Sequence, residues 1–192
     1  KPYFAKAHYN LGNTLQELER LDEALACYTQ AIALKPDFAE AHSNLGGTLK
    51  ELGRLDEAET RYNQAIALKP DYAEAHSNLG NTLQELGRLD EAEASYRQAI
   101  ALKSDLALAH YGLGIVRYIK GNEDLALKSI VKANDIEPPS KDYKLLLSVM
   151  EARKSRKSNK SAVSDSSNIT ALRGLASNPL ILNRAVKPEL IT

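Results

Sequence analysis

The sequence repeats with a period of 34 residues, and this constrains its fold more than any other feature. Four residue types recur in register along the first 140 residues, and residues 39–72 and 73–106 differ at only seven of 34 positions. A period of this length is typical of small units that stack on their neighbours to bury a continuous core. The residues on this grid are Pro2, Pro36, Pro70 and Pro138, His8, His42, His76 and His110, Leu11, Leu45, Leu79 and Leu113, and Gly12, Gly46, Gly80 and Gly114.

Each repeat is predicted to contain two helices. In the first repeat, apolar residues fall at the i, i+3/i+4 and i+7 spacing of a one-sided helix from Ala7 to Leu15, and again from Leu21 to Ile32. Each unit is therefore expected to be a helical hairpin. The four predicted repeats are residues 5–38, 39–72, 73–106 and 107–140.

Turn and capping residues mark the expected ends of these helices. Gly53, Gly87 and Gly121 follow the first helices and can adopt the left-handed conformation that ends a helix, while Glu19 occupies this position in the first repeat. Asp56 and Glu57 place negative charge at the start of a second helix, where the helix dipole favours it. The pairs Asp37 with Glu40 and Asp71 with Glu74 have the spacing of an N-terminal capping box.

These residues resemble the tetratricopeptide repeat (TPR) family. The family pattern of Leu-Gly, a large residue, Ala, an aromatic residue, Ala and Pro is met by Leu45, Gly46, Leu49, Ala58, Tyr62, Ala65 and Pro70. The departures are histidine for the usual Trp, Ser104 for Pro, Ile130 for Tyr and Arg117 for Leu. The resemblance implies an all-α, right-handed superhelical solenoid whose first helices line a concave groove.

The composition changes after the repeats. Residues 141–153 are predicted to form a capping helix with Ser140 as its N-cap, and residues 154–192 a basic, Ser-rich linker with an apolar tail. Residues 1–140 carry a net charge of −6 and residues 141–192 one of +6, so the neutral total conceals an acidic array and a basic tail. We expect the sequence to be a fragment that continues at both ends.

Several classes of function are disfavoured. The net charge of zero argues against a nucleic-acid binder, and we find neither a membrane-spanning run nor a signal peptide, so a cytoplasmic location is expected. Histidines one repeat apart would lie about 10 Å from each other, too far to share a metal ion. No phosphate-binding loop, dinucleotide fingerprint or nucleophile motif occurs. We therefore expect no catalytic residues, cofactor or metal in this chain.

A row of asparagines on the first helices is the candidate peptide-binding site. A carboxamide offers both a donor and an acceptor, so such a row can pair with the backbone of an extended peptide. The row is similar to the asparagine ladder in the repeat arm of O-linked N-acetylglucosamine transferases, and it fails at Gly112. The alternative is that these side chains brace neighbouring hairpins. The residues are Asn10, Asn44 and Asn78, with Asn13 and Asn81 one turn along.

Charge near this row gives a second indication. Glu51 and Glu85 would favour a neutral or basic peptide, unless they belong to an ordinary solvated helix face. TPR proteins that bind chaperone C-terminal tails use a clamp of cations and asparagines, whereas this sequence has Tyr9, Glu74 and Asn78 where the clamp needs cations. Binding to acidic chaperone tails is therefore disfavoured.

The first helix of the fourth repeat carries an apolar stripe where the other repeats are polar. A helix that is apolar on both sides should be covered on both sides. We expect either the capping helix or residues 172–182 to cover the stripe, or a partner's side chain to dock there. Its residues are Leu108, Tyr111, Ile115 and Tyr118.

The sequence thus predicts a protein-protein interaction scaffold that binds an extended peptide or partner protein in the groove. One alternative is the substrate-targeting arm of a larger enzyme. The asparagine row is similar to glycosyltransferases in this respect, and residues 178–192 resemble the segment before iron(II)/2-oxoglutarate oxygenase-like domains. A self-assembling spacer is the third possibility.

Overall fold

The chain is helical throughout the part that the structure, a computed structural model, describes, namely residues 2–137 and residue 148. The all-α fold predicted from the sequence is confirmed, and each predicted repeat contains two helices. The predicted capping helix (141–153, apart from residue 148) and tail (154–192) lie outside the described residues. The helices are α1 (Pro2–Glu17), α2 (Leu21–Leu34), α3 (Ala39–Glu51), α4 (Leu55–Leu68), α5 (Ala73–Glu85), α6 (Leu89–Leu102), α7 (Ala107–Ile119) and α8 (Glu123–Ile136).

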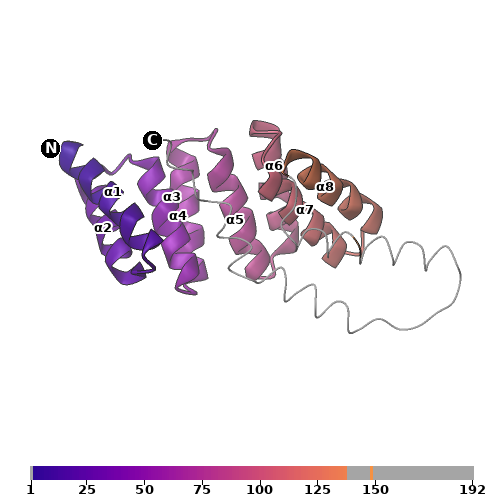
Figure 1. Cartoon of the computed structure of the whole chain (residues 1–192), viewed down its shortest axis with the longest axis horizontal. Coiled ribbons are helices and arrows are strands. Elements are labelled where there is room, and N and C mark those ends of the chain that lie inside the picture. Colours follow the sequence, from indigo (N-terminus) through magenta and orange to yellow (C-terminus); the bar gives the residue numbers. More distant parts are fainter. Residues whose placement is uncertain (1, 138–147, 149–192) are drawn as a thin grey trace, which may run out of the picture. The chain divides into compact units, whose positions relative to one another are not determined.

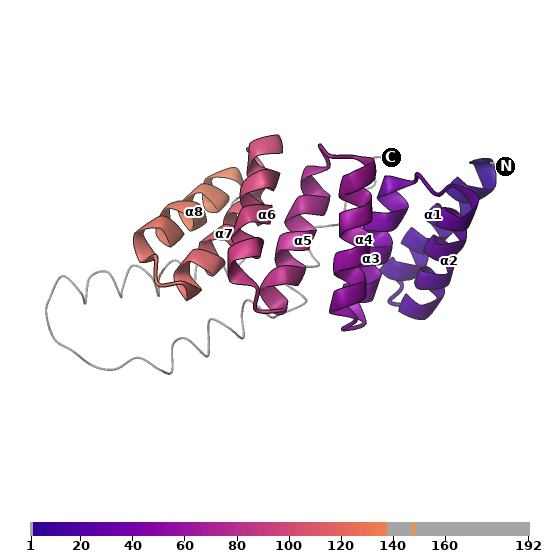
Figure 2. The same cartoon turned by 180° about the vertical axis from the view of Figure 1, so that it is seen from behind.

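The helices belong to two compact units, Lys1–Ser104 with α1 to α6 and Asp105–Thr192 with α7 and α8. In the first unit each second helix packs on the first helix of its own repeat and on that of the next, so α2 contacts both α1 and α3. Figure 1 shows this order of antiparallel hairpins, and Figure 2 shows it from behind. The first helices α1, α3 and α5 consequently lie next to one another.

The two helices of each hairpin meet where a glycine faces an aromatic ring. Tyr28, Tyr62 and Tyr96 of the second helices are at most 1% exposed. A Cβ atom added to Gly12, Gly46 or Gly80 would lie 2.7, 3.0 or 2.8 Å from the facing ring, too close for a real contact. The glycine row seen in the sequence is therefore required for the rings to be buried against the first helices.

The turn within each hairpin depends on one residue with positive φ. Gly53 and Gly87 have φ of 75° and 77°, as expected from the sequence, and Glu19 adopts φ of 59° in the first repeat. In the second repeat, Arg54 N donates to Leu49 O and Gly53 N to Lys50 O, the paired bonds of a Schellman motif. Glu19 makes the corresponding bonds despite its side chain, so the turn is set by the packed hairpin.

The predicted capping boxes are wrong. The N-cap residues of α3 and α5 are Phe38 and Tyr72, and neither helix start has a side-chain cap hydrogen bond. The aromatic side chains at these positions make packing contacts instead: the Phe38 ring centroid lies 4.8 Å from that of Tyr9 in the preceding repeat. An inter-repeat aromatic contact has taken the position that a capping Asp would need.

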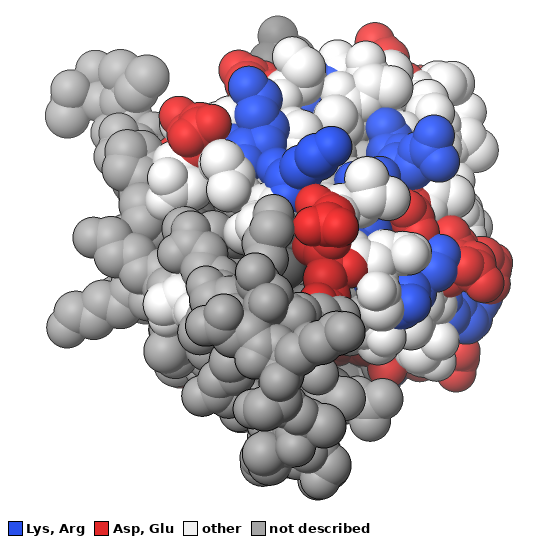
Figure 3. Space-filling model, turned by 90° about the vertical axis from the view of Figure 1, so that its right-hand side faces the viewer, with Lys and Arg blue, Asp and Glu red and all other residues white. Residues whose placement is uncertain are grey.

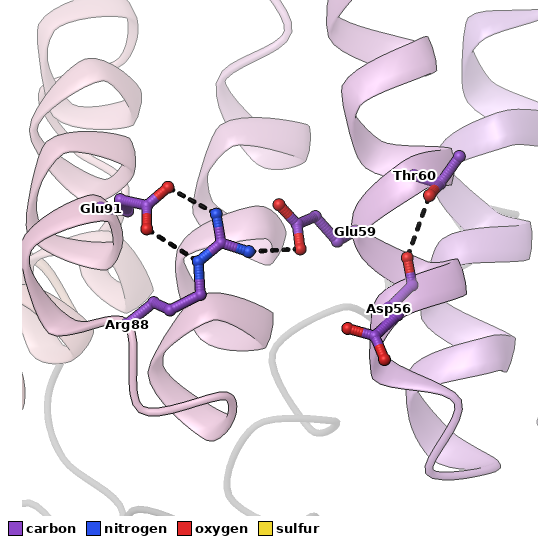
Figure 4. A network of polar contacts seen from close by, with 5 residues as sticks. All are labelled: Asp56, Glu59, Thr60, Arg88 and Glu91. Carbon is purple, nitrogen blue, oxygen red and sulfur yellow. Dashed lines mark hydrogen bonds and ion pairs between the residues drawn. The ribbon is translucent and has the colours of Figure 1, made fainter.

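Charged side chains link the second helices on the outer surface. Arg88, the N-cap residue of α6, binds Glu91 in its own helix and Glu59 of α4, with 2.6 Å between Arg88 Nη1 and Glu59 Oε2 (Figure 4). Arg54 binds Glu57 in the equivalent way. Viewed toward the end of the molecule in Figure 3, acidic and basic side chains lie beside one another. Such exposed pairs orient the helix starts more than they stabilise the fold.

The glycine–tyrosine contact gives a test of the fold with an internal control. Gly80→Ala should destabilise the protein by about 1–3 kcal/mol, because the new methyl group must displace the buried Tyr96 ring. Gly47→Ala, also within a first helix, would place its Cβ at ordinary distances of 3.6 and 3.7 Å from its neighbours. It should stabilise the protein by up to about 1 kcal/mol. Urea unfolding would measure both, and equal effects would contradict the contact.

Candidate functional site

The candidate site is the surface that α1, α3 and α5 form in the first unit, which we call the first-helix face. The five predicted asparagines lie on these three helices at different depths. Asn10 is exposed, Asn13, Asn44 and Asn78 are half-buried, and Asn81 is 5% exposed. The asparagines therefore divide into an outer row and an inner pair.

The inner pair, Asn13 and Asn81, binds the buried tyrosines of the second helices. The Tyr28 hydroxyl lies 2.8 Å from Asn13 Oδ1 and 3.0 Å from Gln16 Oε1. Tyr96 repeats this arrangement with Asn81 Oδ1 at 2.6 Å and Gln84 Oε1 at 3.2 Å. A single hydroxyl proton thus has two amide acceptors in each of these repeats. The inner asparagines satisfy the buried tyrosine hydroxyls of their own hairpins.

Asn44 connects two repeats. Its Nδ2 group donates to Asn13 Oδ1 at 2.8 Å and to the Tyr9 hydroxyl at 3.1 Å. Asn13 Oδ1 therefore accepts from two directions, from Tyr28 in its own repeat and from Asn44 in the next. The bracing alternative considered from the sequence describes this donor group, while Asn44 Oδ1 makes no hydrogen bond within the described residues.

The outer positions Asn10 and Asn78 differ from Asn44. Neither side chain makes a hydrogen bond within the described part of the chain, although Asn10 O and Asn78 O accept from Thr14 and Thr82 of the next turn. The structure thus places three carboxamides at one-repeat intervals with hydrogen-bonding groups still available. This row ends with the first unit, because Gly112 replaces the asparagine in α7.

Glu51 and Glu85 lie between repeats. Gln16 Nε2 donates to Glu51 Oε1 at 3.0 Å, and Lys50 Nζ lies 3.3 Å from Glu85 Oε1. Burial raises the pKa of Glu51, and the hydrogen bond from Gln16 offsets part of that shift. Each carboxylate therefore joins a repeat to the one before it, besides adding negative charge to the first-helix face.

The apolar stripe of the second unit is closed to solvent. Tyr111, Ile115 and Tyr118 are 1%, 7% and 8% exposed, and Leu108 is half-buried. Residues 172–182, which we expected to cover them, lie outside the described residues. The stripe and the asparagine row belong to different units, and we treat them as separate features.

Histidine and carboxylate side chains form no metal site in the described residues, where no group of three or more potential ligands occurs. The His42 ring nitrogen Nε2 lies 3.1 Å from Pro36 O, and that of His76 lies 3.2 Å from Pro70 O. These rings tie the start of a first helix to the preceding turn. In the same part of the chain, no helix is long and apolar enough to cross a membrane.

Sequence reasoning missed the residues that fix the amides. Tyr28 and Tyr96 were identified only as core positions, and Gln16 and Gln84 were not singled out. The signal was present, because glutamines 12 residues before the tyrosines recur on the 34-residue grid. What the sequence could not show is that the tyrosine hydroxyl passes between helices to reach them.

Sequence models of the TPR family match much of the chain. A model described as TPR repeat matches residues 46–87 and 80–121, and two described as tetratricopeptide repeat match residues 5–38 and 27–60. Together these matches span residues 5–121, more than half of the 192 residues. No curated protein sequence matches the chain significantly.

Solved structures show the same fold. MamA from Desulfovibrio magneticus RS-1 is 20% identical with a TM-score of 0.69, covering 96% of this chain and 97% of its own. YrrB, described as a TPR protein with an unusual peptide-binding site, is 21% identical with a TM-score of 0.63 over 88% and 82%. The first TPR domain of Spaghetti (RPAP3), bound to the HSP90 peptide SRMEEVD, is 25% identical with a TM-score of 0.62 over 63% and 96%.

The amide–tyrosine pairs predict a specific coupling. Asn81→Ala should lower the free energy of unfolding by about 1–2 kcal/mol, because the buried Tyr96 hydroxyl loses its shorter acceptor. In a Tyr96→Phe background the same substitution should cost much less, since no hydroxyl then needs an acceptor. Urea unfolding of the four proteins measures the coupling, and equal costs in both backgrounds would show that the hydroxyl does not depend on Asn81.

The raised pKa of Glu51 predicts how stability depends on pH. A carboxyl group whose pKa is higher in the folded state costs no stability below its ordinary unfolded value. The cost develops as the pH rises from that value to the raised one, and is constant above it. Glu51→Gln should therefore be more stable than the parent protein at pH 7, with the difference disappearing near pH 4. Thermal unfolding across this range tests the sign, and a difference that grows on acidification would refute it.

Proposed function

This chain belongs to the tetratricopeptide repeat family, and we propose that it is a protein-interaction scaffold that binds an extended peptide segment of a partner on the first-helix face. The observation that carries this proposal is the outer row of Asn10, Asn44 and Asn78, whose amides keep hydrogen-bonding groups available at one-repeat intervals. Repeated carboxamides on a solvent-reached face suit a ligand that is itself a repeating chain of donors and acceptors.

The spacing of the row fits the backbone of an extended peptide. Neighbouring packed helices lie about 8–10 Å apart. An extended chain rises about 3.3 Å per residue, so successive asparagines would meet the peptide at about every third residue. Recognition through main-chain groups makes affinity depend only weakly on the side chains of the ligand. The scaffold we propose therefore accepts a class of peptides.

Charge selects within this class. Glu51 and Glu85 add negative charge to the face, which favours a neutral or basic peptide over an acidic one. Tyr9, Glu74 and Asn78 stand where a chaperone-binding TPR domain has cations, and Glu74 already pairs with Lys103 at 2.9 Å. We therefore propose that acidic tails such as the HSP90 peptide bound by the Spaghetti domain are poor ligands here.

Related structures support peptide binding as the general role, since both the Spaghetti domain and YrrB are described with peptide or a peptide-binding site. We propose no catalytic step for the described residues. The hypothesis that the chain is the targeting arm of an enzyme depends on residues 178–192, which lie outside them.

The proposal is tested with asparagine substitutions against pools of acetylated, amidated octapeptides. Asn10→Ala and Asn78→Ala should each weaken binding of many different peptides by about two- to tenfold, the value of one lost hydrogen bond. Neither substitution removes a side-chain hydrogen bond within the described residues, so the fold should be retained. Fluorescence polarisation with individual peptides taken from the pools measures the factors.

Asn63→Ala is the matched control, because Asn63 is an exposed asparagine on α4, away from the first helices. It should leave every affinity unchanged. A loss confined to one peptide sequence would contradict main-chain recognition, and a loss equal to that of the control would place the ligand elsewhere.

A further inference from the structure

The second repeat lacks the acceptors that its neighbours supply to the buried tyrosine. Position 47 is glycine where the first and third repeats have Asn13 and Asn81, and position 50 is lysine where they have Gln16 and Gln84. These two changes are among the seven that distinguish residues 39–72 from residues 73–106. A lysine ammonium group is a donor only, so it cannot replace the glutamine oxygen.

Tyr62 is consequently left with a hydroxyl that has no hydrogen-bond partner in the described residues. Its side chain is 1% exposed, as buried as Tyr28 and Tyr96, which each have two amide oxygens within reach. Burial without a partner is costly for a hydroxyl group. The Lys50 ammonium that stands in place of the glutamine is directed to Glu85 of the next repeat.

A second donor is left over at the same position. In the first repeat, Asn13 Oδ1 accepts from Tyr28 and from Asn44 of the following repeat, both at 2.8 Å. The equivalent donors in the second repeat are Tyr62 and Asn78, and neither has a side-chain hydrogen bond within the described residues. By this internal comparison, one missing oxygen atom would satisfy both donors.

The position is also reachable and has room. Gly47 is half-buried, and a Cβ atom placed on it would lie 3.6 Å from the Tyr62 hydroxyl oxygen and 3.7 Å from Gln16 Nε2, ordinary contact distances. This contrasts with Gly46, where a Cβ would lie 3.0 Å from the Tyr62 ring. Gly47 is therefore not required by packing, and its absent side chain leaves the tyrosine hydroxyl facing an open position.

We propose that the open position at Gly47 is a subsite that receives the side-chain carboxamide of an asparagine or glutamine from the bound peptide. The carboxamide oxygen takes the place that Asn13 Oδ1 has in the first repeat, accepting from Tyr62 and Asn78. This inference rests on the proposed function, because it assumes a peptide on the first-helix face.

Charge distinguishes a carboxamide from a carboxylate, which offers the same oxygen. Glu51 accepts from Gln16, whose amide nitrogen borders the open position, and Glu85 lies on the adjacent α5. A ligand carboxylate would be repelled by these two groups, while a carboxamide is neutral and its NH₂ group can donate. The subsite therefore adds side-chain selectivity at one point along a ligand recognised elsewhere through its backbone.

Three octapeptide pools, identical except for Gln, Ala or Glu at one fixed central position, test the selectivity. We expect the parent protein to retain the Gln pool about five- to tenfold better than the Ala pool, and the Glu pool no better than the Ala pool. Tyr62→Phe and Gly47→Asn should each abolish this preference while leaving binding of the Ala pool within about twofold. The first removes a donor, and the second supplies an acceptor from the chain itself.

Stability provides an independent arm. Gly47→Asn should raise the unfolding temperature relative to Gly47→Ala by about 2–4 °C more in the presence of Tyr62 than in a Tyr62→Phe background. The comparison with alanine removes the general effect of replacing a helical glycine. Equal differences in the two backgrounds would overturn the inference, because Tyr62 would not reach an acceptor at position 47.

The failures of the two proposals are distinguishable. Binding of all three pools with equal strength overturns the subsite and leaves the peptide scaffold standing. Binding of none of them overturns the scaffold, and the ligand subsite with it. A preference for the Glu pool would also overturn the subsite as proposed, since the neighbouring carboxylates would then not govern the choice.

Discussion

The close approach of a glycine on each first helix to the tyrosine of its second helix is the contact on which the first unit depends. Gly12, Gly46 and Gly80 allow the rings of Tyr28, Tyr62 and Tyr96 to be almost completely buried, because any side chain there would collide with the ring. Burying a large aromatic residue contributes much of the stability available to a small hairpin. The same contact brings the two helices close enough for the next repeat to pack across both.

This contact also connects the core to the binding surface. A tyrosine that lies flat against the glycine carries its hydroxyl through to the first-helix face, where Asn13 and Asn81 accept from it. The polar residues of that face therefore serve two purposes. Some satisfy buried groups of their own hairpin, and others, such as Asn10 and Asn78, keep their amides available for a ligand. Asn44 does both with its two ends.

Much of the fold was predictable from the sequence, whereas the site was predictable only in part. Apolar spacing and the glycines at 53 and 87 gave the helices and turns, because these are local properties of the chain. The capping boxes failed, since Phe38 and Tyr72 serve an inter-repeat contact that local spacing does not reveal. The asparagine row was recognised as a pattern, but its division into inner and outer members depends on how deeply each side chain is buried.

By itself, the 34-residue grid determined that this chain forms helical hairpins with small residues where their helices cross, because periodicity and size are properties of each residue. Only the tertiary structure decided which polar groups find partners. The difference between Asn13 and Gly47 is a single substitution in the sequence, yet it leaves Tyr62 and Asn78 without an acceptor in the described part of the chain. Hydrogen bonds between side chains 15 or 31 residues apart exist only once the helices have packed, so no local pattern could specify them.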